Sequence, residues 1–182
     1  MTAYLTSSTT LCHPDDPAQR STAGPCAHAL QLEGVTVAAR CAYYEQVCQL
    51  PAVPDPVSGQ IVVVAGRVQA VMVPSALGRR VRSELGRVEV GCGPIVSHPK
   101  SGTWTFLTDS DRRIEALPDA TRLWVNGVVV LASGARIGLP TPTATNTGSC
   151  RAWESPPTSP QRPTTTRVLD AVRRSLQQGG AR

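Results

Sequence analysis

The chain has 182 residues, which is room for one modest domain with tails, since domains commonly run to about 100–150 residues. Its 18 basic and 13 acidic side chains give a formal net charge of +5, and arginine supplies all but one of the basic groups. This balance permits attraction to nucleic acid or to acidic partners without requiring it. No apolar run approaches the ~20 residues that span a bilayer, so we expect no membrane-spanning helix and no membrane partner.

The start of the chain and its cysteines indicate the compartment. Residues 1–10 lack the basic start and the apolar core of a secretory signal. We therefore expect a cytoplasmic protein, in which cysteines stay reduced and do not form a disulfide framework. Six residues are concerned: Cys12, Cys26, Cys41, Cys48, Cys92 and Cys150.

The first 34 residues are rich in Thr, Ser, Pro and Ala and show no sustained periodicity, which predicts a mobile, disordered arm over 1–34. Cys12, His13, Cys26 and His28 within it are of the types that bind tetrahedral zinc. Their spacing is unlike that of zinc fingers, and one site would be strained by two adjacent ligands. We therefore expect no metal site there.

An α+β core domain is predicted over 35–140. A helix is expected over 40–50, with Pro51 ending it, because four side chains share one face at helical spacing. These are Cys41, Tyr44, Val47 and Cys48. Residues 54–59 then form a turn-rich connection, rich in Pro, Ser and Gly.

Two β-branched runs, 61–64 and 68–73, flank Gly66 and Arg67, which predicts a β-hairpin. Pro74 suits the start of a helix, because its missing N–H is not needed there. The helix that follows carries an apolar stripe repeated every four residues: Leu77, Val81 and Leu85. Its arginines lie roughly opposite the stripe (Arg79 and Arg82) or flank it (Arg80 and Arg87).

The next segment, 93–107, predicts a strand, a polar turn and a second strand, with His98, Lys100 and Gly102 in or beside the turn. A short helix is expected over 111–117. Asn126-Gly127 between two apolar runs is typical of a type I′ β-hairpin. A further short strand is expected over 136–139.

The rest of the chain divides into two parts. Prolines and Thr/Ser residues over 141–163 predict a loop or linker, in which Trp153 is expected to pack on the domain. Residues 164–182 predict a C-terminal amphipathic helix and tail, because apolar residues recur on one face until Gly179-Gly180. The predicted fold is therefore α+β: a single small domain with a mostly antiparallel sheet of short strands and two to four helices.

Several short motifs spread over 41–163 also resemble a protein family. They are Cys41–Tyr44, Leu50-Pro51, Asp55-Pro56, Gly66, Ala70–Pro74, Leu77-Gly78, Gly93–Pro99, Trp104–Leu107 and Ile137–Pro140, ahead of Trp153. These motifs resemble a group of short actinobacterial proteins that are similar to the N-terminal domain of bifunctional DNA primase/polymerases. The resemblance covers roughly two thirds of the chain and implies a compact cytoplasmic α+β domain.

A primase/polymerase site needs carboxylates that hold a divalent metal, beside a basic or histidine group that steadies the nucleotide phosphates. The family pattern places an Asp-x-Asp pair before the histidine motif. Asp109 and Asp111 have the pair's spacing, but they follow His98. This order favours helix capping by Asp109 or Asp111 and predicts no cofactor. The alternative is nucleotidyl transfer with Mg²⁺ or Mn²⁺ and a nucleotide, using Asp109, Asp111 and His98.

Candidate contacts to nucleic acid are Arg79, Arg82 and Lys100, although an ordinary solvated helix face gives the same pattern. Aromatic residues make up only 4% of the chain, so few are left to stack on bases. We therefore expect a non-catalytic binding or accessory module with a protein or nucleic-acid partner. A metal-dependent nucleotidyl transferase and a weak nucleic-acid-binding protein are the alternatives.

Overall fold

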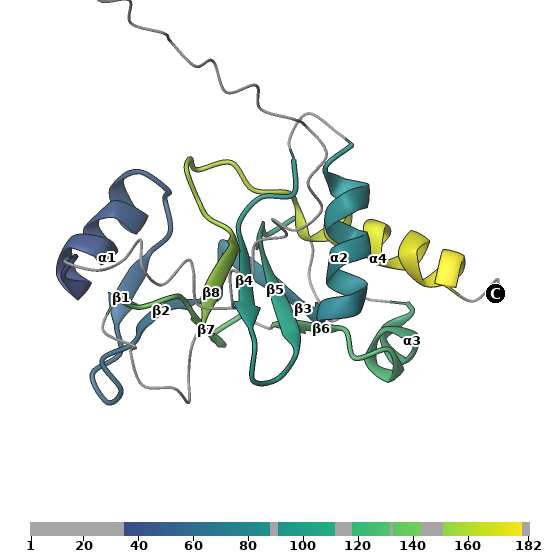
Figure 1. Cartoon of the computed structure of the whole chain (residues 1–182), viewed down its shortest axis with the longest axis horizontal. Coiled ribbons are helices and arrows are strands. Elements are labelled where there is room, and N and C mark those ends of the chain that lie inside the picture. The colour runs from purple at the N-terminus through teal and green to yellow at the C-terminus, as the bar shows by residue number, and fades with distance from the viewer. Residues whose placement is uncertain (1–34, 88–90, 112–117, 132, 143–150, 180–182) are drawn as a thin grey trace, which may run out of the picture.

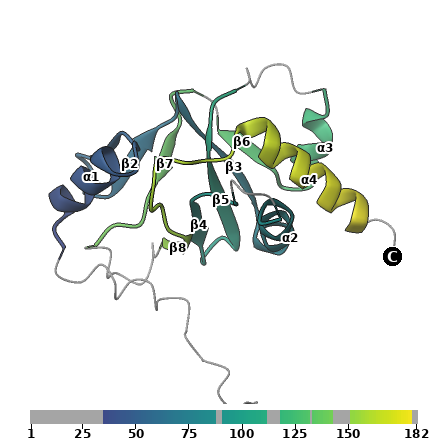
Figure 2. The ribbon, with the colours of Figure 1, turned by 90° about the horizontal axis from the view of Figure 1, so that it is seen from above.

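Two antiparallel sheets pack against each other, with two helices on the outer side of the larger sheet and one helix packed into the core that the two sheets share (Figures 1 and 2). The computed structural model describes residues 35–87, 91–111, 118–131, 133–142 and 151–179. Within them the helices are α1 (Val37–Gln46), α2 (Ser75–Leu85), α3 (Ala120–Val125) and α4 (Thr165–Gly179). The strands are β1 (Ala52–Pro54), β2 (Ile61–Val64), β3 (Val68–Pro74), β4 (Ile95–His98), β5 (Thr103–Asp109), β6 (Val129–Leu131), β7 (Arg136–Gly138) and β8 (Ala152–Ser155).

The larger sheet has the order β6-β3-β5-β4-β8 and the smaller has the order β1-β2-β7, with every pair of neighbours antiparallel. Helices α2 and α4 lie on one side of the larger sheet, and the smaller sheet with α1 lies on the other, as Figure 2 shows. The predicted α+β fold, with mostly antiparallel sheets and two to four helices, is confirmed.

Side-chain alternation along β3 builds two cores from one strand. Val71 and Val73 pack with α2 and α4, whereas Val68 and Ala70 pack with the smaller sheet and α1. Successive side chains of a strand point to opposite faces, so a strand that is covered on both sides is apolar except where a buried polar group has a partner. The run of β3 is apolar apart from Gln69, which is buried and accepts a hydrogen bond from Thr165, and it therefore marks β3 as a central strand.

The hairpin predicted over 61–73 is wrong, although both strands exist. β2 pairs with β1 and β7, while β3 pairs with β5 and β6. At the end of β2 the backbone of Ala65 exchanges hydrogen bonds with residues 134 and 135, which carries the chain out of one sheet and into the other. A β-branched run specifies a strand, but it does not specify its partner.

The hairpin predicted at Asn126-Gly127 is also wrong, because these residues end helix α3. Gly127 has a φ of 70°, but Asn126 has a φ of −92°, whereas a type I′ turn needs positive φ at both positions. The Gly127 N–H donates to the Trp124 carbonyl and the Val128 N–H donates to the Leu123 carbonyl, which is a Schellman motif. The same dipeptide therefore serves as a helix cap.

Helix α1 begins and ends earlier than the sequence predicts. Thr36 caps it, since its Oγ1 accepts the Ala39 N–H at 3.2 Å. The helix ends at Gln46, so Val47 leaves the predicted face and is 43% exposed, while Cys48 is buried beyond the helix. Cys41 and Cys48 are free thiols, as expected, and burial raises the pKa of each.

The segment predicted as a loop or linker over 141–163 contains β8, which pairs with β4 at the edge of the larger sheet. Trp153 is buried there, and its Nε1 donates to the Tyr44 hydroxyl oxygen at 2.9 Å. The packing of Trp153 on the domain and the amphipathic C-terminal helix are thus confirmed. In α4 the residues Val168, Leu169 and Val172 are fully buried.

Some predictions concern residues outside those that the structure describes. They include the arm 1–34 with Cys12, His13, Cys26 and His28, together with Cys150 and most of the helix expected over 111–117. Among the described helices, none has both the length and the apolar character needed to cross a membrane.

Candidate functional site

The predicted site residues lie at opposite ends of strand β5. His98 pairs in register with Thr103, the first residue of β5, whereas Asp109 is its last residue. Seven extended residues span roughly 20 Å at about 3.4 Å per residue. The structure therefore does not bring His98 together with Asp109 and Asp111. A single metal ion and the nucleotide phosphates it holds would not reach both groups.

Asp109 is held by a buried arginine that the sequence did not single out. The Nε and Nη2 groups of Arg162 donate to Oδ1 of Asp109 at 3.0 and 2.8 Å, and Nη1 donates to the Cys48 carbonyl at 2.9 Å. The Arg162 side chain is 2% exposed and that of Asp109 is 41% exposed. A buried guanidinium needs such partners, because removing its charge from water is costly. This arrangement, the Arg162 clasp, ties β5 to the residues just beyond α1 and to the segment before α4.

Asp111 caps the start of helix α4. Its Oδ1 accepts the backbone N–H of Thr166 at 3.1 Å. Partial burial raises the pKa of Asp111, but hydrogen bonds from Thr164 and Thr166 outweigh that effect and bring the pKa below its ordinary value of 3.8. A carboxylate at a helix N-terminus satisfies a free N–H group and complements the helix dipole. The expected capping role is therefore present at helix α4.

His98 is half-buried on the side of the larger sheet that faces the smaller one. Its Nε2 lies 2.8 Å from Oγ1 of Thr105, with which it shares a hydrogen bond. Burial lowers the pKa of His98 from 6.5 to about 4, and the nearby charge of Arg151 adds to the effect. The imidazole is thus neutral at physiological pH.

Arg151 is a second basic group that the sequence did not single out. It donates to Oε1 of Gln60 and packs on Gly138, where any Cβ would overlap the guanidinium. Burial lowers the pKa of Arg151, and no carboxylate of the described residues forms an ion pair with it. Arg151 could not be singled out from the sequence, because one of its partners, Gln60, is 91 positions away along the chain.

Two of the three candidate nucleic-acid contacts lie on helix α2, and the third lies in the turn that meets the start of this helix. The Ser75 N–H donates to the Gly102 carbonyl at 2.8 Å, so the turn that carries Lys100 meets the start of α2. Ser75, Arg79 and Arg82 follow one another at i, i+4 and i+7, which places them on one helix face. Arg82 forms an ion pair with Glu154 of β8. Among the described residues, Arg79 and Lys100 have no ion-pair partner.

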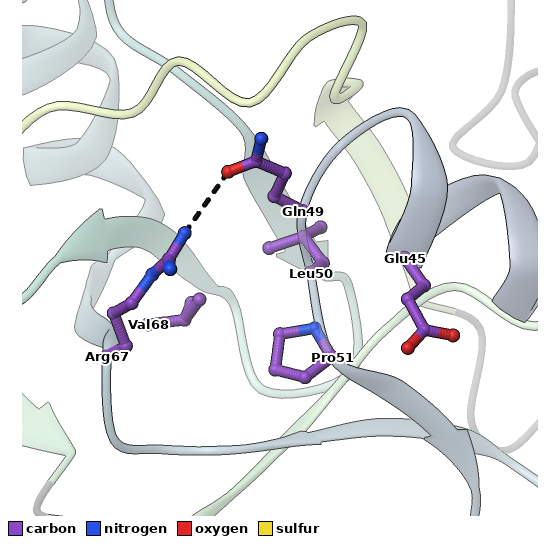
Figure 3. A pocket seen from close by; sticks show the side chains of 6 residues that line it. All are labelled: Glu45, Gln49, Leu50, Pro51, Arg67 and Val68. Carbon is purple, nitrogen blue, oxygen red and sulfur yellow. Dashed lines mark hydrogen bonds between the residues drawn. The ribbon is translucent and has the colours of Figure 1, made fainter.

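A pocket of about 500 Å³ opens between the end of α1 and the start of β3 (Figure 3). The buried side chains of Leu50 and Val68 line its floor with Pro51, and exposed polar side chains stand at its rim. Those rim residues are Glu45, Gln49 and Arg67. The pocket was not among the predicted sites, because its residues come from two separate elements and share no motif.

The described part of the chain contains no cluster of three or more His, Cys, Asp or Glu residues arranged to hold a metal ion. Comparisons of the chain with models of known protein families, with curated proteins and with solved structures give no match.

Proposed function

We propose that this protein is a binding or accessory module that contacts nucleic acid weakly through Arg79, Arg82 and Lys100. The observation that carries the proposal is the pair of exposed cations without acidic partners among the described residues, Arg79 on α2 and Lys100 in the turn that meets the start of α2. Phosphate groups are the ligands that such cations attract most strongly in nucleic acids. The module resembles the N-terminal domain of primase/polymerases in its motifs.

The positions of the carboxylates favour binding over nucleotidyl transfer. Asp109 accepts two hydrogen bonds from Arg162, and Asp111 accepts the Thr166 N–H. A metal ion would have to compete with these bonds for both carboxylates, and the nearest histidine candidate lies at the other end of β5. This arrangement supports a protein that binds its partner without transferring a nucleotide.

Three cations support only weak binding. The logarithm of affinity for single strands falls by about 0.7 for each neutralised phosphate per tenfold rise in salt, so three contacts predict a slope of about −2. Glu154 offsets part of the charge of Arg82, which makes Arg79 and Lys100 the main contributors.

The proposal is tested by titrating the protein into fluorescently labelled single-stranded DNA and measuring anisotropy at several salt concentrations. We expect Arg79→Gln with Lys100→Gln to lower affinity about tenfold and to reduce the salt slope to about −0.7, since two of three phosphate contacts are lost. The matched control is Arg122→Gln with Arg136→Gln, which removes the same charge from exposed positions on α3 and β7. Equal losses in both double variants would contradict the interface, as would the absence of binding by the wild type.

Nucleotidyl transfer makes a different prediction. Calorimetric titration of a nucleoside triphosphate with Mg²⁺ is expected to give no heat of binding in the wild type. Binding that disappears in Asp111→Asn, while the fold stays intact, would overturn the proposed function in favour of the enzyme.

A further inference from the structure

The pocket between α1 and β3 carries two opposite charges that the fold leaves uncompensated. Among the described residues, every acidic side chain except Glu45 and Asp111 forms an ion pair, and Asp111 caps α4. Glu45 is exposed, and so is Arg67, which has no ion-pair partner within the same residues. Both side chains line one pocket, yet they do not meet each other.

The space between the two charges is apolar. Figure 3 shows Pro51 and Leu50 between Glu45 on one side and Arg67 with Gln49 on the other. Leu50 and Val68 are almost completely buried and lie beneath the pocket as part of the core, so the exposed Pro51 is the apolar surface that a ligand meets. A volume of about 500 Å³ lies in the range of ordinary small-molecule sites, which combine an apolar surface with a few polar groups.

Gln49 holds the guanidinium in place at a conformational cost. Its φ of 51° makes it the one non-glycine residue with positive φ in the described part of the chain. Glycine is favoured in this left-handed conformation just beyond a helix end. Gln49 provides what glycine lacks, because its Oε1 accepts the Nη2 group of Arg67 at 3.1 Å. The bond leaves the other donors of Arg67 free to bind a ligand.

These features select a ligand with two charges. The planar donors of arginine suit a carboxylate, and the carboxylate of Glu45 suits a protonated amine. A ligand with one charge alone would leave the opposite rim group without a partner. We propose that the pocket binds a small dipolar molecule of the amino-acid class, whose carboxylate meets Arg67, whose ammonium meets Glu45, and whose aliphatic body lies on the exposed Pro51 between them.

The test uses ω-amino acids of increasing length, with hexanoate and hexylamine as single-charge controls. Each is titrated into the full-length ¹⁵N-labelled protein, and amide chemical shifts are recorded. We expect one member of the series to bind in the millimolar range, to shift amides of residues 45–51 and 67–68, and to bind at least about tenfold more tightly than either control. Binding of hexanoate or hexylamine as tight as that of the best amino acid, or shifts confined to other residues, would overturn the proposal. So would a series in which no member binds.

Substitutions separate ligand binding from folding. Arg67→Gln and Glu45→Gln are each expected to lower affinity about tenfold, while Arg136→Gln, an exposed arginine outside the pocket, leaves it unchanged. Gln49→Gly is expected to keep or raise the melting temperature, because it relieves the left-handed strain, and yet to weaken binding about threefold. Full affinity in Arg67→Gln would overturn the site, and full affinity in Gln49→Gly would overturn the positioning role of Gln49.

Discussion

The two ends of strand β5 treat their charges in opposite ways. At the Asp109 end the backbone N–H of Asp109 donates to the Pro163 carbonyl, and the Arg162 clasp and the cap from Asp111 use the polar groups within the fold. At the Thr103 end the chain reverses in a turn, and Lys100 remains exposed beside the start of α2. The comparison teaches that the acidic candidates are engaged in holding the domain together, whereas Arg79 and Lys100 have no ion-pair partner among the described residues.

Replacing Arg162 tests the Asp109 end of β5 and is expected to have the largest effect on stability. Arg162→Met removes three hydrogen bonds from a buried guanidinium, so we expect the free energy of unfolding to fall by about 3 kcal/mol. Arg136→Met is the control, because it removes an arginine of a surface ion pair with Asp55 and should cost less than about 1 kcal/mol. Urea unfolding followed by tryptophan fluorescence measures both, and equal losses would remove the distinction between a buried clasp and a surface pair.

Alanine substitutions at two glycines allow a direct comparison of the two ends of β5. Gly93 and Gly102 have nearly the same φ, 66° and 64°, so alanine meets similar backbone strain at each. A Cβ at Gly93 would overlap Cδ of Pro163, whereas a Cβ at Gly102 would enter open space. We expect Gly102→Ala to lower the free energy of unfolding by about 1 kcal/mol and Gly93→Ala by about 2 kcal/mol. Thermal unfolding of both variants checks the order, and a larger loss at Gly102 would contradict the crowding at the Asp109 end.

The smallest expected effect on stability concerns His98 and occurs only at acid pH. The unfolded chain protonates this group near pH 6.5, but the folded protein keeps it neutral down to a pKa of about 4. The neutral imidazole therefore stabilises the fold fully above pH 6.5, and this contribution is lost as the pH falls from 6.5 to 4.

Melting temperatures across this range should fall more steeply for the wild type than for His98→Gln. His13 and His28 are present in both proteins, so the difference between them isolates His98. Parallel pH profiles would show that His98 is not buried as described.

The elements that the sequence predicts correctly are those that depend on local spacing. The apolar stripe of α2 and the hairpin of β4 and β5 were both predicted because side-chain periodicity and turn residues act within a few positions. Gly102, with its positive φ, turns the chain between β4 and β5 as expected. The positions of Arg79 and Arg82 on one face of α2 follow from this local structure, whereas Lys100 reaches the start of α2 through the contact between Ser75 and Gly102.

The tertiary structure decided which of several possible conformations or strand partners each local sequence pattern adopts. Asn126-Gly127 ends a helix and β2 joins a different sheet from β3, because the choice between two locally acceptable conformations depends on what each buries. Arg162 meets Asp109 across 53 positions and Cys48 across 114, and no local pattern encodes such pairs. The pocket of Glu45 and Arg67 likewise forms only when α1 packs beside β3. Local periodicity therefore determined most helices and strands of this protein. Contacts between polar side chains that are far apart in the sequence decided which of its charged groups are paired within the fold and which remain unpaired.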